Sequence, residues 1–332
     1  MTRLSLRLKA FLVRTIQSIF TLFDLYFSHP LPQRVSFTRK IKSTVSSIPG
    51  SIDLLFYTPP SYTKSSSKTV KKHLLLVNFH GGGLTIGHAK DDARWATSVT
   101  NEASAVVCSV EYRLAPSYPF PVGIEDCVSA VLWLWKHADE FNLDISKTAF
   151  SGFSGGGNLC YAVSIRLHEE LERLKREGKL DAGLEEGKVV SLVVFYGSTD
   201  QTLSRAEKDA SNPNLIPTIP PFLFKLFDES YLSSNPDLIS PLLSPGIASD
   251  EVLREGLPDR LVMINCGGDQ LLVEGERFRQ RLKGLGKVVD GYVVEGVGHG
   301  WDKKPTWKGG DKKRDEAYAF AVKSLNGVWS LV

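Results

Sequence analysis

Ser154 is the residue of this chain best suited to do chemistry, because it stands at the centre of a Gly-x-Ser-x-Gly motif at 152–156. In a nucleophile elbow, such a serine occupies a sharp turn between a strand and a helix, and its hydroxyl can attack a carbonyl carbon. The flanking glycines are small because the strand and the helix pass close to each other there. A glycine-rich turn with an incidental serine would show the same five residues. The motif alone leaves both interpretations open.

A second element of the same chemistry lies upstream. His80 directly follows the apolar segment 73–79 and precedes a run of three glycines at 81–83. We expect the backbone N–H groups of Gly81, Gly82 and Gly155 to form an oxyanion hole, which binds the negative charge that develops during acyl transfer. A phosphate-binding loop is the alternative, but the glycine and lysine spacing of such loops is missing. We expect His80 to support the loop rather than to act as a base.

The candidate base and its partner lie downstream. His299 stands between two glycines, and imidazole is the usual base near neutral pH. Asp269 follows an apolar run and can accept the Nδ1–H of that imidazole. The chain order Ser154, Asp269, His299 is typical of an α/β-hydrolase. Glu274 and Asp302 are weaker candidates for the acid, because both fall beyond a strand end in helix-like or exposed sequence.

Apolar runs and helix-like segments alternate along the chain and would position these residues. Near-continuous apolar runs predict strands buried on both faces, and amphipathic segments predict helices between them. The expected strands are 51–57, 73–79, 105–110, 147–151, 189–195, 261–266 and 288–294, and the expected helices are 91–103, 124–141, 158–175, 275–285 and 315–325. This alternation predicts an α/β fold whose mainly parallel sheet is covered on both faces.

Residues 201–257 break the alternation. They hold a cluster of prolines around a short apolar helix at 222–231, and they are too long for a simple connection. We expect an insertion over the site. Phe222, Phe224 and Phe227 either line an acyl pocket or only pack the insertion onto the body.

The N-terminal segment has its own character. Residues 1–50 carry eight lysines and arginines against one acid, Asp24, although the whole chain has a net charge of only +3. That small net charge argues against nucleic acid as a partner. Arg14 and Asp24 interrupt the apolar run, which argues against a spanning helix, and no clear cleavage site marks a signal peptide. The pattern favours an amphipathic helix, packed on the protein or lying on a membrane through residues 1–27.

These motifs together resemble the hormone-sensitive-lipase-like α/β-hydrolases, which include bacterial esterases and arylacetamide deacetylase. The resemblance rests on 80–83, 112–116, 119–121, 152–156, Asp269 and His299, and it spans residues 70–325. It implies a mostly parallel eight-stranded sheet flanked by helices, with a helical cap. In that arrangement residues 1–50 supply N-terminal cap helices, 51–200 and 258–332 form the hydrolase core, and 201–257 form the cap insertion.

One position near the nucleophile departs from the family pattern. The family's usual Gly-Asp-Ser-Ala-Gly is Gly-Phe-Ser-Gly-Gly here, so Phe153 stands where an acid outside the triad is common. We expect less polar surroundings at Ser154, with consequences for substrate preference rather than for the reaction.

The expected activity is that of a serine esterase or deacetylase acting on a carboxylic ester of short to medium acyl length. Ser154 would attack, His299 would transfer the proton and Asp269 would orient His299, with no metal or cofactor. A small-ligand receptor and a lyase, amidase or acyltransferase on the same scaffold remain alternatives. The four scattered cysteines are expected to be buried thiols in a reducing, cytoplasmic setting. A homodimer and peripheral membrane contact through residues 1–27 are left open.

Overall fold

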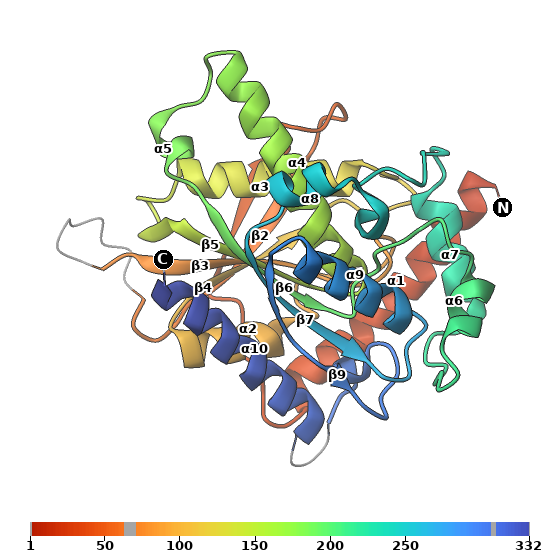
Figure 1. Ribbon diagram of the computed structural model, residues 1–332. Coiled ribbons are helices and arrows are strands. Elements are labelled where there is room, and N and C mark those ends of the chain that lie inside the picture. Colours follow the sequence, from red (N-terminus) through yellow and green to blue (C-terminus); the bar gives the residue numbers. More distant parts are fainter. Residues whose placement is uncertain (1, 63–70, 307–309, 332) are drawn as a thin grey trace.

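The computed structural model describes residues 2–62, 71–306 and 310–331. A sheet of nine strands runs through the molecule in the order β1-β2-β4-β3-β5-β6-β7-β8, and β9 pairs with β7 (Figure 1). The strands are β1 (Phe37–Lys42), β2 (Ser51–Tyr57), β3 (His73–Phe79), β4 (Val106–Glu111), β5 (Leu143–Phe153), β6 (Val189–Phe195), β7 (Arg260–Cys266), β8 (Val288–Asp290) and β9 (Val293–Val294). Strands β1, β2 and β4 pair antiparallel, and all the other pairs are parallel. The expected mostly parallel sheet is confirmed.

Helices cover both faces of this sheet, and each layer encloses its own apolar core. The helices are α1 (Arg3–Phe27), α2 (Ala93–Ala103), α3 (Val122–Lys136), α4 (Gly155–Arg176), α5 (Ala182–Glu185), α6 (Arg205–Ser211), α7 (Pro221–Tyr231), α8 (Asp250–Gly256), α9 (Leu272–Gly284) and α10 (Lys312–Leu331). One core lies between the sheet and α3, α4, α8 and α9, and the other lies between the sheet and α2 and α10 (Figure 1). This layering explains why the central strands are apolar along nearly their whole length. All four cysteines are buried free thiols, as expected.

The expectation that residues 1–50 form only cap helices is wrong for 37–42. This segment is the edge strand β1, which pairs antiparallel with β2. Of its six residues only Ile41 is buried, and Thr38, Lys40 and Lys42 on the opposite face of this edge strand are exposed. The short polar and apolar alternation explains why the sequence did not mark it as a buried strand.

The expected strand 288–294 is divided into β8 and β9. Gly291 separates the two, with a φ of 132° that other residues rarely adopt. Both pieces pair in parallel with β7.

The segment 201–257 does not form one body. Helix α7 lies against α1, and α6 contacts α9 (Figure 1). Helix α8 instead packs against α4, with Leu253 fully buried in the core. The cap-like part of this segment is therefore α6, α7 and the loops around them, and the division of the chain into cap and core remains a proposal.

Candidate active site

Ser154 occupies the single residue between strand β5 and helix α4. Its backbone has φ 55° and ψ −118°, a conformation rarely adopted outside special turns. A side-chain Cβ on Gly156 would lie 2.0 Å from the carbonyl oxygen of Phe79, and one on Gly152 would lie 2.1 Å from that of Gly156. Neither position has room for any other residue. The turn therefore has the geometry expected of a nucleophile elbow.

The structure brings the three predicted side chains together. His299 Nε2 lies 2.7 Å from Ser154 Oγ, and His299 Nδ1 lies 2.6 Å from Asp269 Oδ2. The backbone N–H of Leu271 donates to Asp269 Oδ1 at 3.0 Å and fixes the carboxylate, which is 1% exposed. A hydroxyl, an imidazole and a buried carboxylate in this order can move a proton from the serine to the histidine.

The other two candidate acids bind different partners. Glu274 pairs with Lys208 at 2.7 Å, and Asp302 accepts the hydroxyl groups of Tyr196 and Tyr318. Neither carboxylate bonds to His299. Asp269 is the acid that the geometry assigns to the histidine.

The glycine loop after β3 lies directly beside the elbow. A Cβ on Gly155 would be 3.3 Å from the Cα of Gly83, and one on Gly81 would be 3.6 Å from the Cβ of Ser154. Gly155 is also the first residue of α4, where N–H groups have no partner within the helix and the helix dipole is positive. The predicted donors Gly81, Gly82 and Gly155 thus belong to two backbone segments that touch at Ser154.

His80 is buried behind this loop. Its ring stacks on Tyr112 with centroids 4.3 Å apart, and its Nδ1–H donates to the carbonyl oxygen of Gly81 at 2.8 Å. The Tyr112 hydroxyl donates to the His80 carbonyl oxygen at 2.7 Å. Burial lowers the pKa of His80 to about 3, so the ring is neutral in the folded protein near neutral pH. These contacts favour support of the loop as the role of His80.

Phe153 forms apolar surroundings on one side of the nucleophile. It stacks on Phe195 with centroids 4.4 Å apart, and the ammonium group of Lys303 lies 3.2 Å from the centre of its ring. Burial opposes the charge of Lys303, but Asp302 and Asp92 outweigh it and raise the pKa of this lysine. Sequence reasoning missed Lys303, because nothing in the spacing of 301–304 indicates that it reaches the elbow.

Two cavities meet at Ser154 and His299. The inner pocket is small, with a volume of about 50 Å³, and the outer cleft is larger, with a volume of about 430 Å³. The inner pocket is lined by residues of α4, of α7 and of the turns after β6 and β7, including Asn158, Ser198, Gln201, Phe224, Phe227, Tyr231 and Gln270. The outer cleft is lined by the glycine loop, Phe153, Lys303 and residues of α1, including Phe20 and Leu25.

Of the three phenylalanines considered for an acyl pocket, Phe224 and Phe227 line the inner pocket, and Phe227 also lines the outer cleft. Phe222 is 63% exposed and lines neither cavity. The pocket interpretation therefore fits two of the three.

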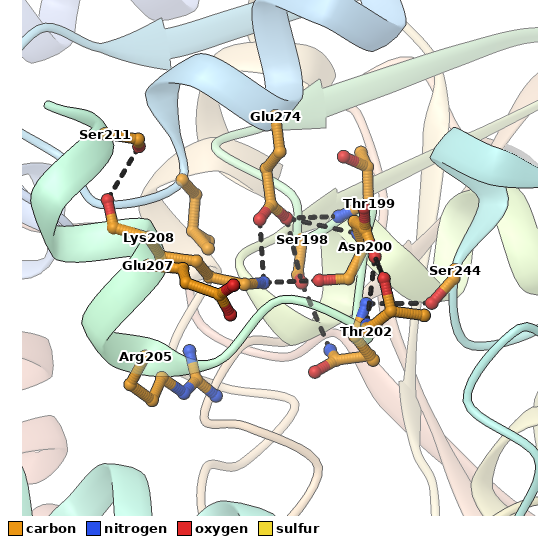
Figure 2. A network of polar contacts seen from close by, with 12 residues as sticks. Ser198, Thr199, Asp200, Thr202, Arg205, Glu207, Lys208, Ser211, Ser244 and Glu274 are labelled. Carbon is orange, nitrogen blue, oxygen red and sulfur yellow. Dashed lines mark hydrogen bonds and ion pairs between the residues drawn. The ribbon is translucent and has the colours of Figure 1, made fainter.

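A buried ion pair joins α6 to α9 near the inner pocket (Figure 2). Lys208 of α6 pairs with Glu274 of α9, and its ammonium group also donates to the carbonyl oxygen of Asp200 at 2.6 Å. Glu274 accepts the backbone N–H of Thr199 at 2.7 Å. The network thus ties α6 and the turn after β6 to α9, the helix that follows the Asp269 turn.

The comparisons with known proteins agree with this architecture. A family model described as "alpha/beta hydrolase fold" matches residues 76–303. An arylesterase from Saccharolobus solfataricus is 30% identical over 231 residues, which is 70% of this chain and 69% of that protein. Hormone-sensitive lipase from Ictidomys tridecemlineatus is 35% identical over 99 residues, covering 30% of this chain and 13% of the lipase. The match covers only 57% of two longer relatives, carboxylic ester hydrolase LipN from Mycobacterium tuberculosis and tuliposide A-converting enzyme 2 from Tulipa gesneriana.

Among solved structures, one from a study of two fungal esterases of Rhizomucor miehei superposes with a TM-score of 0.75 at 26% identity. The superposition covers 97% of this chain and 91% of that one. The likeness therefore extends beyond residues 76–303 to nearly the whole chain.

Proposed function

Because the chain belongs to the α/β-hydrolase-fold family of hormone-sensitive lipase and the related esterases, we propose that it is a serine carboxylic-ester hydrolase. The observation that carries the proposal is the continuous hydrogen-bonded series from Ser154 through His299 to Asp269, placed at the meeting point of two cavities.

The proposed reaction begins with attack of Ser154 Oγ on the ester carbonyl carbon while His299 Nε2 takes the hydroxyl proton. The carbonyl oxygen becomes an oxyanion, which the N–H groups of Gly81, Gly82 and Gly155 bind. One such donor is typically worth about 10²–10³ in rate. The imidazolium, held by Asp269, gives its proton to the leaving alcohol. Water then attacks the acyl carbon while His299 takes its proton. The acid leaves as His299 returns that proton to Ser154 Oγ.

The two cavities support a division of the substrate. We assign one part of the ester to the inner pocket and the other to the outer cleft, with the reacting carbonyl at Ser154 between them. The inner pocket combines aromatic walls with amide side chains, among them Asn158 and Gln270, and would hold the smaller part of the ester, while the larger outer cleft would hold the rest. The buried free thiols suit a reducing location such as the cytoplasm.

The test is hydrolysis of 4-nitrophenyl acetate and butyrate by the full chain and by Ser154→Ala. We expect the variant to lose at least about 10³-fold in kcat/KM, because the nucleophile is gone. Ser330→Ala, which changes a serine near the end of α10, is the matched control and should keep the parent's rate. Equal thermal unfolding midpoints for all three proteins would show that the fold is intact.

Each alternative gives a different result. A Ser154→Ala protein as active as the parent would overturn the proposed nucleophile. Stoichiometric binding of a small acid or ester without turnover would indicate a receptor instead. An eliminated product would indicate a lyase.

A further inference from the structure

Helix α1 is attached to the body through polar contacts on one face and through packing on α7. Arg14 donates to the carbonyl oxygens of Thr85 at 2.9 Å and Ala115 at 2.6 Å. One turn further along, Gln17 and Thr21 donate to Asp91, at 2.7 Å and 2.6 Å, and Asp24 pairs with Arg94 at 2.9 Å. The spacing 14, 17, 21, 24 places these four side chains on one face of the helix. Only Leu6 and Ala10 of α1 are buried.

The opposite side of α1 is apolar and exposed. Ten large apolar side chains on this helix are each more than half exposed: Leu4, Leu8, Phe11, Leu12, Ile16, Ile19, Phe20, Leu22, Tyr26 and Phe27. We call these ten residues the apolar face of α1. Single exposed apolar residues are ordinary, but a contiguous face along a helix of 25 residues is not. The helix thus turns its polar face toward the protein and its apolar face toward the outside, which is the opposite of the usual arrangement in a soluble protein.

We propose that the apolar face of α1 seats the enzyme on an anionic lipid surface, with α1 in the plane of the interface, and that the ester enters the outer cleft from that surface. By length and composition α1 is also apolar enough to cross a membrane. Spanning would require all the contacts of Arg14, Gln17, Thr21 and Asp24 with the body to break, and the in-plane orientation keeps them.

Charge argues for a lipid surface over a second copy of this chain. Asp24 is the single acid in residues 1–50, and it faces inward to Arg94. Arg3, Arg7 and Arg34 are exposed, and Arg34 lies over the ring of Tyr26 on the apolar face. Cationic side chains bordering a convex apolar ridge complement anionic headgroups, whereas two such ridges would bring like charges together.

The position of the cleft connects this surface to catalysis. Phe20 belongs to the apolar face and, with Leu25, lines the outer cleft that also contains Ser154 and His299. An apolar ester dissolved in the lipid could therefore reach the nucleophile without crossing water. This second half of the inference rests on the proposed ester hydrolysis.

The test uses flotation with phosphatidylcholine vesicles, with and without phosphatidylserine, and compares three full-length proteins. Leu12→Gln, Ile16→Gln and Ile19→Gln together replace three exposed members of the apolar face. Ile48→Gln, Ile239→Gln and Ile247→Gln are the matched control, because these isoleucines are exposed elsewhere on the surface. We expect the α1 triple variant to lose about tenfold or more in vesicle partition, while the control binds anionic vesicles like the parent.

Activity separates this inference from the proposed function. All three proteins should hydrolyse soluble 4-nitrophenyl acetate equally, and only the α1 variant should lose rate on 4-nitrophenyl octanoate presented in anionic vesicles. A parent that cleaves the acetate but floats with no vesicle would overturn the lipid surface and leave ester hydrolysis standing. A parent dimer that becomes a monomer in the α1 variant would assign the face to a second copy. Retention of the parent in the vesicles after an alkaline carbonate wash would indicate a spanning helix and contradict the in-plane arrangement.

Discussion

At the scale of single residues, Phe153 shows how the elbow tolerates an unusual neighbour. An acid at this position would bring a charge beside the nucleophile, whereas the phenyl ring supplies a face for the Lys303 ammonium group. That ammonium group lies 2.7 Å from Asp92 and 3.1 Å from Asp302, so carboxylates from two separate segments compensate its charge near Ser154. Ser154 therefore keeps an apolar neighbour without leaving the partly buried Lys303 uncompensated.

His80 gives a prediction about stability and pH. In the unfolded chain the imidazole has its ordinary pKa of 6.5, whereas in the folded protein burial lowers the pKa to about 3. Above pH 6.5 His80 is neutral in both states and does not lower the free energy of unfolding. Below pH 6.5 only the unfolded chain takes up the proton, so the free energy of unfolding falls as the pH falls. Between pH 7.5 and 5 the loss amounts to about 2 kcal/mol. In urea unfolding, the free energy of unfolding should fall between pH 7.5 and pH 5 by about 2 kcal/mol less for His80→Asn than for the parent.

The control for this measurement is His29→Asn, because His29 is exposed. It should retain the parent's pH dependence. If His80→Asn and the parent lose the same free energy of unfolding on acidification, burial of a neutral His80 is not a source of acid sensitivity.

At the scale of secondary-structure elements, the Lys208–Glu274 pair fixes α6 against α9. Lys208→Met would leave the Glu274 carboxylate buried without its cation, at a cost of about 3–5 kcal/mol in the free energy of unfolding. The double variant Lys208→Met with Glu274→Gln should recover much of that loss, since a neutral amide can still accept the N–H of Thr199. Urea unfolding of the parent and both variants measures the three free energies.

Lys72→Met serves as the matched substitution, because Lys72 and Asp139 form an ion pair at the surface, with side chains 47% and 84% exposed. Such a pair contributes little, and its loss should barely change stability. Equal losses for Lys72→Met and Lys208→Met would contradict the special role of burial.

The elements that the sequence predicted correctly are those whose pattern depends on burial alone. The central strands are apolar because helices cover both faces, and the order of Ser154, Asp269 and His299 is set by the ends of those strands. Besides Lys303 and the division of strand 288–294, two features escaped prediction. The edge strand β1 has one buried residue, so it carries almost no burial signal. The orientation of α1 escaped because apolar periodicity normally marks the inward face, whereas here four hydrogen-bonding side chains hold the helix by its polar face.

At the scale of the whole molecule, the structure divides into a tightly packed core and a weakly attached cover. Helix α4 packs on β5, β6, α3 and α8, and it is buried along most of its first half. Helix α1 is held by the polar contacts of Arg14, Gln17, Thr21 and Asp24 and by packing on α7, and only two of its residues are fully buried. Regions with few buried apolar contacts open locally far more often than the core.

This division predicts the pattern of backbone hydrogen exchange in the intact chain. Amides of α1 should exchange at least about 10²-fold faster than those of α4, because only Leu6 and Ala10 of α1 are fully buried whereas opening α4 disrupts the core. Mass-spectrometric exchange of full-length protein measures both helices in one sample. Anionic vesicles should slow exchange in α1 and leave α4 unchanged, because a lipid surface would add apolar burial only where the helix is exposed. Equal protection of the two helices in water would mean that α1 opens only with the core, and its polar contacts would then be far stronger than their surface position implies.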